Sequence, residues 1–157
     1  MRRLAPALVL LGALAGCGRE PAFPDRTARV TVGGRTTTFT VDACGLDGQT
    51  FRLAARSESG AVLQATVGVE SDGETGVPRS TGFTLFGWDT VDLAAFGDEA
   101  WARRGGEGEA PGEVETARIR GARIQAAGEA AVVDADEVPT GDQVLAVSLD
   151  ARCDAED

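Results

Sequence analysis

The chain has 157 residues, with 25 acidic against 15 basic side chains and a formal net charge of −10. This acidity argues against nucleic acid as a partner, because binding to phosphate backbones requires clustered positive charge. The 157 residues include no His, Tyr or Lys, which removes Ser-His-Asp, Cys-His and Schiff-base catalysis. We therefore expect a protein that is not an enzyme and holds no cofactor, with a carboxylate-dependent hydrolase as the remote alternative.

The first 16 residues have the order of a secretory signal peptide. Arg2 and Arg3 precede an apolar run over residues 4–15, shorter than the roughly 20 residues that a membrane-spanning helix needs. The run ends in Leu14-Ala15-Gly16-Cys17, which resembles the bacterial lipobox, where the chain is cut before a cysteine that carries a diacylglycerol. An ordinary signal peptide that happens to precede a cysteine is the alternative.

Lipid on Cys17 predicts how the chain is organised and where it is located. Two acyl chains suffice for stable attachment to a membrane, so we expect export and anchoring at the outer face of the cytoplasmic membrane or in the cell envelope. The predicted segments are a signal peptide at 1–16, a lipidated tether at 17–28 and one β domain at 29–154. Pro21 and Pro24 favour an extended tether.

Two cysteines remain once Cys17 is assigned to lipid, namely Cys44 and Cys153. An even pair in an exported protein is most simply a disulfide, which would join the two ends of the domain through a loop of about 110 residues. A redox pair or a metal site is the alternative. Because the pair lacks CxxC spacing and the chain lacks His, we predict no metal site.

Alternation of apolar and polar side chains predicts strands along most of the domain. The expected strands are 30–32, 36–41, 51–55, 63–69, 83–88, 117–119, 124–133 and 145–153, with turns at Gly33-Gly34 and Gly121 and loops at 71–81 and 134–142. This pattern predicts an all-β fold, a single antiparallel sandwich, half-barrel or clamp of about seven to eight strands.

Residues 89–104 fit two structures. Val91, Leu93 and Ala95 alternate as in a strand, whereas Leu93, Phe96, Ala100 and Trp101 share one face of a helix that would end at Gly105. The acidic segments 70–74 and 134–137 present oxygen ligands of the kind that calcium prefers. Neither completes the EF-hand pattern, so we interpret both as turns.

Five aromatic side chains lie close together in the sequence: Phe83, Phe86, Trp88, Phe96 and Trp101. They could line an apolar groove for a protein, lipid or glycan ligand, or they could belong to the core. A groove would favour a non-catalytic binding module. Burial of all five, without a sizeable pocket, would favour a structural envelope lipoprotein with no dedicated ligand.

Several motifs resemble the mycobacterial nineteen-kilodalton lipoprotein antigen family. They are the lipobox, the Val30-Thr31-Val32-Gly33-Gly34 segment before a cysteine, and the segments 123–130 and 147–153. The resemblance implies a cell-envelope lipoprotein with a disulfide between Cys44 and Cys153, and recognition by host receptors through the lipid. Two features depart from the family, because its glycosylated Thr-rich stretch is reduced here to Thr27 and residues 97–112 look inserted.

Overall fold

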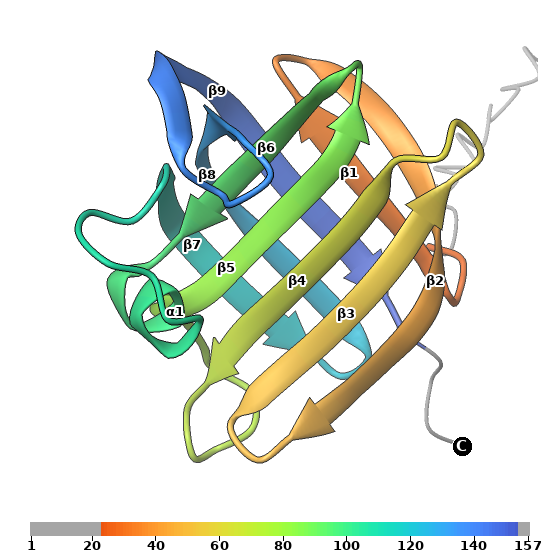
Figure 1. The fold of residues 1–157 in the computed structure, drawn as a ribbon. Coiled ribbons are helices and arrows are strands. Elements are labelled where there is room, and N and C mark those ends of the chain that lie inside the picture. The colour runs from red at the N-terminus through yellow and green to blue at the C-terminus, as the bar shows by residue number, and fades with distance from the viewer. Residues whose placement is uncertain (1–22, 154–157) are drawn as a thin grey trace, which may run out of the picture.

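The computed structural model describes residues 23–153, which form one antiparallel sheet of nine strands and a single short helix (Figure 1). This confirms the predicted all-β fold and adds a strand to the expected seven or eight. The predicted signal peptide and the lipidation site Cys17 lie outside the described residues. Within 23–153, no helix has the length and hydropathy needed to cross a membrane.

The elements follow one another along the chain with short connections. They are β1 (Thr27–Val32), β2 (Arg35–Asp47), β3 (Thr50–Ser57), β4 (Val62–Val69), β5 (Gly76–Trp88), β6 (Val91–Phe96), α1 (Asp98–Arg103), β7 (Glu113–Arg120), β8 (Arg123–Val133) and β9 (Pro139–Arg152). Several turns have the predicted residues. Gly33 and Gly34 connect β1 to β2 with φ values of 54° and 85°, which a two-residue hairpin turn requires.

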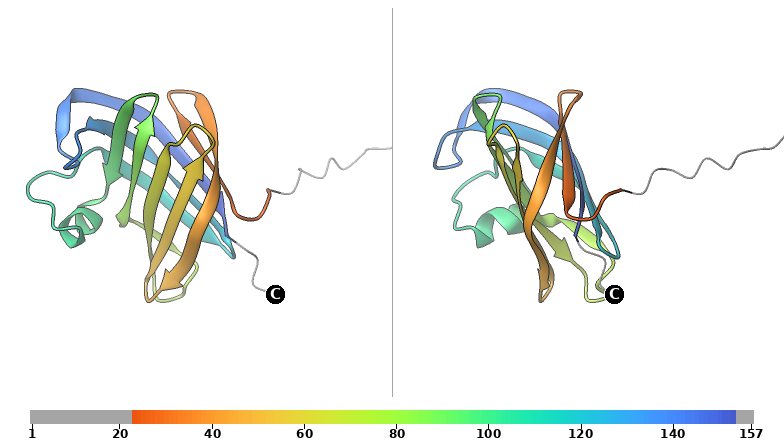
Figure 2. Two further views of the ribbon diagram at one scale, coloured as in Figure 1. Left: turned by 45° about the vertical axis from the view of Figure 1, so that its right-hand side comes forward. Right: turned by 90° about the vertical axis from the view of Figure 1, so that its right-hand side faces the viewer.

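The sheet curls until its two ends meet. Its strand order is β6-β5-β4-β3-β2-β1-β9-β8-β7, and β6 pairs in addition with β8. The first and last strands of the chain are neighbours in the middle of this order, where β1 pairs with β9 from Thr27 to Val32. Strands β2 to β5 lie in front of β1, β7, β8 and β9, and α1 lies outside the sheet (Figures 1 and 2).

The main core lies between these two layers. Alternate side chains of each strand point inward, and the largest fully buried ones come from both layers: Phe39, Leu63, Phe83, Leu85, Leu93 and Leu149. In β6, Leu93 and Ala95 join this core, whereas Ala94 and Phe96 pack on the opposite side with Ala100 of α1. Because the strand is covered on both faces, Leu93 and the three residues after it in β6 are all apolar.

Both interpretations of residues 89–104 are correct for part of the segment. Strand β6 ends at Phe96, and α1 begins after Gly97. A Cβ at Gly97 would lie 2.4 Å from the carbonyl oxygen of Pro78, so only glycine allows this close approach to β5. Acidic Asp98 opens α1, which suits the helix dipole, and Gly105 follows it with φ 85°.

Several expected strand boundaries are wrong. Strand β1 begins at Thr27, before the predicted strand at 30–32, whereas β5 and β9 begin at Gly76 and Pro139, inside the segments predicted as loops. The first residues of β5 pair with the end of β4 beyond a β-bulge. Residues 139–144 of β9 are all exposed, so they show no alternation of burial that the sequence could reveal.

Candidate ligand cavity beside the disulfide

A disulfide closes one end of the sheet, as predicted. Cys44 of β2 is bonded to Cys153, which follows β9, across a sequence separation of 109 residues and a Cα–Cα distance of 5.8 Å. This distance is ordinary for a disulfide. The bond holds the C-terminal end of the described chain against the second strand.

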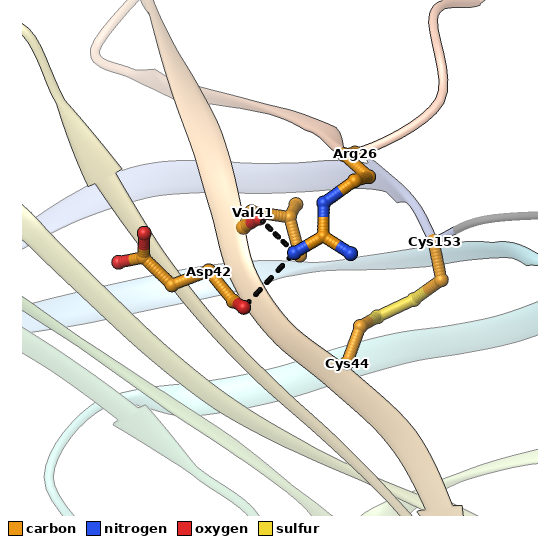
Figure 3. Close-up of a disulfide and its surroundings, with 5 residues drawn as sticks. All are labelled: Arg26, Val41, Asp42, Cys44 and Cys153. Carbon is orange, nitrogen blue, oxygen red and sulfur yellow. Dashed lines mark hydrogen bonds between the residues drawn. A yellow bond between two sulfur atoms is a disulfide. The ribbon is translucent and has the colours of Figure 1, made fainter.

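Arg26 lies next to this disulfide (Figure 3). Its Nη2 donates hydrogen bonds of 3.0 Å to the backbone carbonyls of Val41 and Asp42, so the residues that lead into β1 are held against β2. Arg26 itself has φ 50°, a left-handed conformation that costs energy for a side chain other than glycine. The two hydrogen bonds help to offset that cost.

A cavity of about 800 Å³ lies beside the disulfide. It is bounded by the β2–β3 hairpin, the β4–β5 loop, the β7–β8 turn and the end of β9. Its apolar lining comes from Val41, Leu46, Phe51, Ile119, Ala122 and the two bonded cysteines, and its charged lining from Arg26, Arg120, Arg123 and Arg152. The volume falls in the range of ligand sites, roughly 300–1,000 Å³.

The four arginines differ in how well they are paired. Arg123 contacts Asp150 through two bonds of 2.8 and 2.6 Å, and Arg152 contacts Asp25 at 2.7 Å. Arg120 is exposed and has no hydrogen-bond or ion-pair partner among residues 23–153. No acidic residue is part of the lining, so the cavity surface is positive in a chain that is acidic overall.

Asp150, near this cavity, accepts hydrogen bonds from both Arg123 and Gln125. Burial raises its pKa, but hydrogen bonds from Arg123 and Gln125 and the positive charges of Arg123 and Arg29 outweigh burial, so that the pKa lies below its ordinary value of 3.8. A carboxyl group whose pKa is lower in the folded than in the unfolded chain stabilises the fold above the unfolded pKa. This stabilisation is lost as the pH falls through the folded pKa.

We therefore expect the effect of Asp150→Asn on stability to depend on pH. Its cost in unfolding free energy should be largest near pH 6 and should shrink as the pH falls below about 4, first through the pKa of Asp150 in the unfolded chain and then through its lower pKa in the folded protein. Urea unfolding of both proteins at pH 6, 4 and 3 measures this difference. Asp142→Asn, which removes one exposed charge from the same strand, is the control. A cost that stayed constant down to pH 3 would contradict the role of Asp150.

A second, shallower groove of about 490 Å³ lies beside α1, on the side of β4 and β5 away from the main core. Its lining includes Thr66, Gly82, Phe96 and Arg104. A Cβ at Gly82 would lie 2.1 Å from the Phe96 ring, so the absence of a side chain at 82 lets that ring pack closely against the strand.

The five aromatic side chains do not come together as one groove. Phe83 and Phe96 line the groove beside α1 but are 2% and 4% exposed, and Phe86, Trp88 and Trp101 line neither cavity. Trp88 packs against the main core with Arg35 above its ring, and Trp101 packs against Phe96. They contribute mainly to packing.

The two acidic segments form turns. Asp72 accepts hydrogen bonds from the backbone of Glu74 and Thr75, and Asp134 accepts them from Asp136 and Val138. Among residues 23–153, no group of three or more potential ligands is arranged to hold a metal ion. The positive cavity, in contrast, was not predicted from the sequence, because its arginines come from widely separated segments.

Comparisons with known proteins do not assign the chain to a family. No protein-family model matches it, and no curated protein matches it either. The resemblance to the nineteen-kilodalton antigen family therefore stays a prediction from the motifs.

Proposed function

We propose that the chain is a cell-envelope lipoprotein, anchored through lipid on Cys17, whose β domain is a non-catalytic binding module. The observation that supports a binding role is the cavity beside the disulfide, about 800 Å³ in volume and lined by apolar and cationic side chains. A purely structural lipoprotein has no need of such a cavity. Leu46 at its edge is 56% exposed, so the cavity opens onto the surface beside an apolar side chain.

The cavity lies at the end of the domain that the predicted tether enters. Arg26 lines the cavity and is about nine residues from Cys17, a length of chain that spans at most about 32 Å when extended. Lipid on Cys17 would therefore hold the cavity close to the membrane surface. This arrangement supports a ligand that comes from the membrane or from the envelope around it.

The polar side chains at the cavity support binding more than catalysis. They are arginines, which stay protonated and so do not exchange protons at neutral pH. General acid–base chemistry needs a group whose pKa lies near the working pH, and no such group lines this cavity. The motifs shared with the mycobacterial nineteen-kilodalton antigen family support the envelope location.

Intact-mass measurement of the membrane-extracted protein tests the anchor. We expect a chain that begins at Cys17 and carries the mass of a diacylglycerol, because the lipobox directs both modification and cleavage. Cys17→Ala should abolish both the added mass and the cleavage before residue 17. Ser71→Ala, an exposed loop residue, is the matched control and should keep both. Cleavage at another residue without added lipid would contradict the anchor while leaving the binding role open.

A further inference from the structure

The charge of the cavity beside the disulfide is opposite to that of the whole chain. Four arginines line it without an acidic residue, although the formal net charge of the protein is −10. A guanidinium is a planar group whose paired N–H donors match the two oxygens of a carboxylate. The lining is therefore chemically suited to an anion.

Arg120 is the arginine best placed to bind such an anion. It stands at the β7–β8 turn, exposed and with no hydrogen-bond or ion-pair partner among residues 23–153. Arg123 and Arg152, in contrast, are already paired with Asp150 and Asp25. The unpaired guanidinium of Arg120 carries one positive charge. A carboxylate, with one negative charge, neutralises it, whereas a doubly charged phosphate would leave one negative charge without a partner.

The rest of the lining is suited to a hydrocarbon chain. Val41 and Ile119 are 1% and 7% exposed and form the inner part of the wall, whereas Phe51 is half-buried. Leu46 pairs with Phe51 across the β2–β3 hairpin and stays 56% exposed. An alkyl chain beside Leu46 and Phe51 would remove apolar surface from water on both partners.

We propose that this cavity binds a fatty acid, with its carboxylate on Arg120 and its chain against Leu46 and Phe51. The proposal rests on the proposed function, since it takes the β domain to be a binding module and names the class of its ligand. Arg120 supplies the preference for an anionic ligand, and burial of the hydrocarbon chain of the fatty acid supplies most of the affinity.

Titration calorimetry with dodecanoate, below its micelle concentration, tests the proposal on residues 18–157, which contain the complete described sheet and its core. The comparison ligands are dodecanol, which lacks the charge, and acetate, which lacks the chain. Arg120→Met removes the guanidinium, and Arg118→Met is the matched control. Arg118 lies on the same strand, is exposed and does not line the cavity.

Dodecanoate should bind the wild type and the Arg118→Met variant equally. It should bind the Arg120→Met variant about tenfold more weakly, the usual loss when a hydrogen bond to a charged group is removed. Dodecanol should bind the wild type more weakly than dodecanoate does, acetate should not bind measurably, and 0.5 M salt should weaken dodecanoate binding. NMR shifts caused by dodecanoate should cluster at Phe51, Ile119 and Ala122 rather than at Thr66 and Gly82 of the other groove.

Three results would overturn the proposal. Equal losses in the two arginine variants would mean non-specific attraction to charge. Equal binding of dodecanol and dodecanoate, unaffected by Arg120→Met, would mean an apolar site without a preference for anions, and the binding role would stand. If none of these ligands binds, the fatty-acid proposal is wrong. The membrane anchor is tested separately, by the intact mass.

Discussion

Replacing Cys44 by serine should lower the free energy of unfolding of the oxidised protein by about 4–5 kcal/mol, in the chain-entropy account of a disulfide that closes a loop of 109 residues. The disulfide joins β2 to the segment after β9 and so restricts nearly the whole described chain when it unfolds. The melting temperature should fall by about 10–20 °C. Thermal unfolding followed by circular dichroism measures both changes.

The redox state of the wild type is the matched control for this prediction. Wild-type protein treated with a reductant should melt close to the temperature of the Cys44→Ser variant, and the variant should not respond to the reductant. The double variant Cys44→Ser/Cys153→Ser should resemble the single one, because Cys153 is buried and no longer has a partner. An oxidised wild type that melts like the variant would show that the disulfide contributes no stability.

The second large effect concerns Glu137, a carboxylate buried in the β8–β9 loop. Its side chain is 8% exposed, whereas that of its ion-pair partner Arg104 is 40% exposed. Glu137 accepts hydrogen bonds from Thr84 at 2.7 Å and from Nη2 of Arg104 at 2.6 Å, with a further bond from Nε of Arg104. The pair joins the end of α1 to the β8–β9 loop across the Phe96 ring.

We expect Arg104→Met to destabilise the protein by about 3 kcal/mol, because it leaves a buried carboxylate without its counter-charge. Glu137→Gln should cost clearly less, since the freed guanidinium is partly exposed and can be hydrated again. The double variant Arg104→Met/Glu137→Gln should recover part of the loss. Urea unfolding of the four proteins measures the coupling, with Arg118→Met as the control for loss of an unpaired arginine. Equal costs for the two single variants would contradict this asymmetry.

The positions of individual strands could be predicted from the sequence, because the alternation of buried and exposed side chains along a strand appears as an alternation of apolar and polar residues. In β4, Leu63, Ala65 and Val67 alternate with more exposed residues, and this period of two defines a strand without knowledge of its neighbours. Hairpin glycines and an even pair of cysteines are local signals of the same kind. The all-β class, the Gly33-Gly34 turn and the disulfide followed from them.

Where no local pattern exists, the prediction failed for a physical reason. The start of β9 is exposed on both faces, so its sequence resembles that of a loop. It is a strand because it pairs with β8, and this pairing leaves no pattern in the sequence. Glu137 belongs to an acidic segment that reads as a solvated turn, yet folding buries its side chain under contacts from β5 and α1. Such burial depends on which distant elements cover the residue.

The sequence by itself determined the strands, the turn residues and the pair of cysteines, since each is encoded by neighbours a few positions apart. Only the tertiary structure decided that β1 lies beside β9, that β6 closes the sheet onto β8, and that the cavity is positive. Its four arginines come from the start of β1, the β7–β8 turn and the end of β9. Strand pairing brings these segments together, and pairing is a choice among distant partners that the alternation along one strand does not encode.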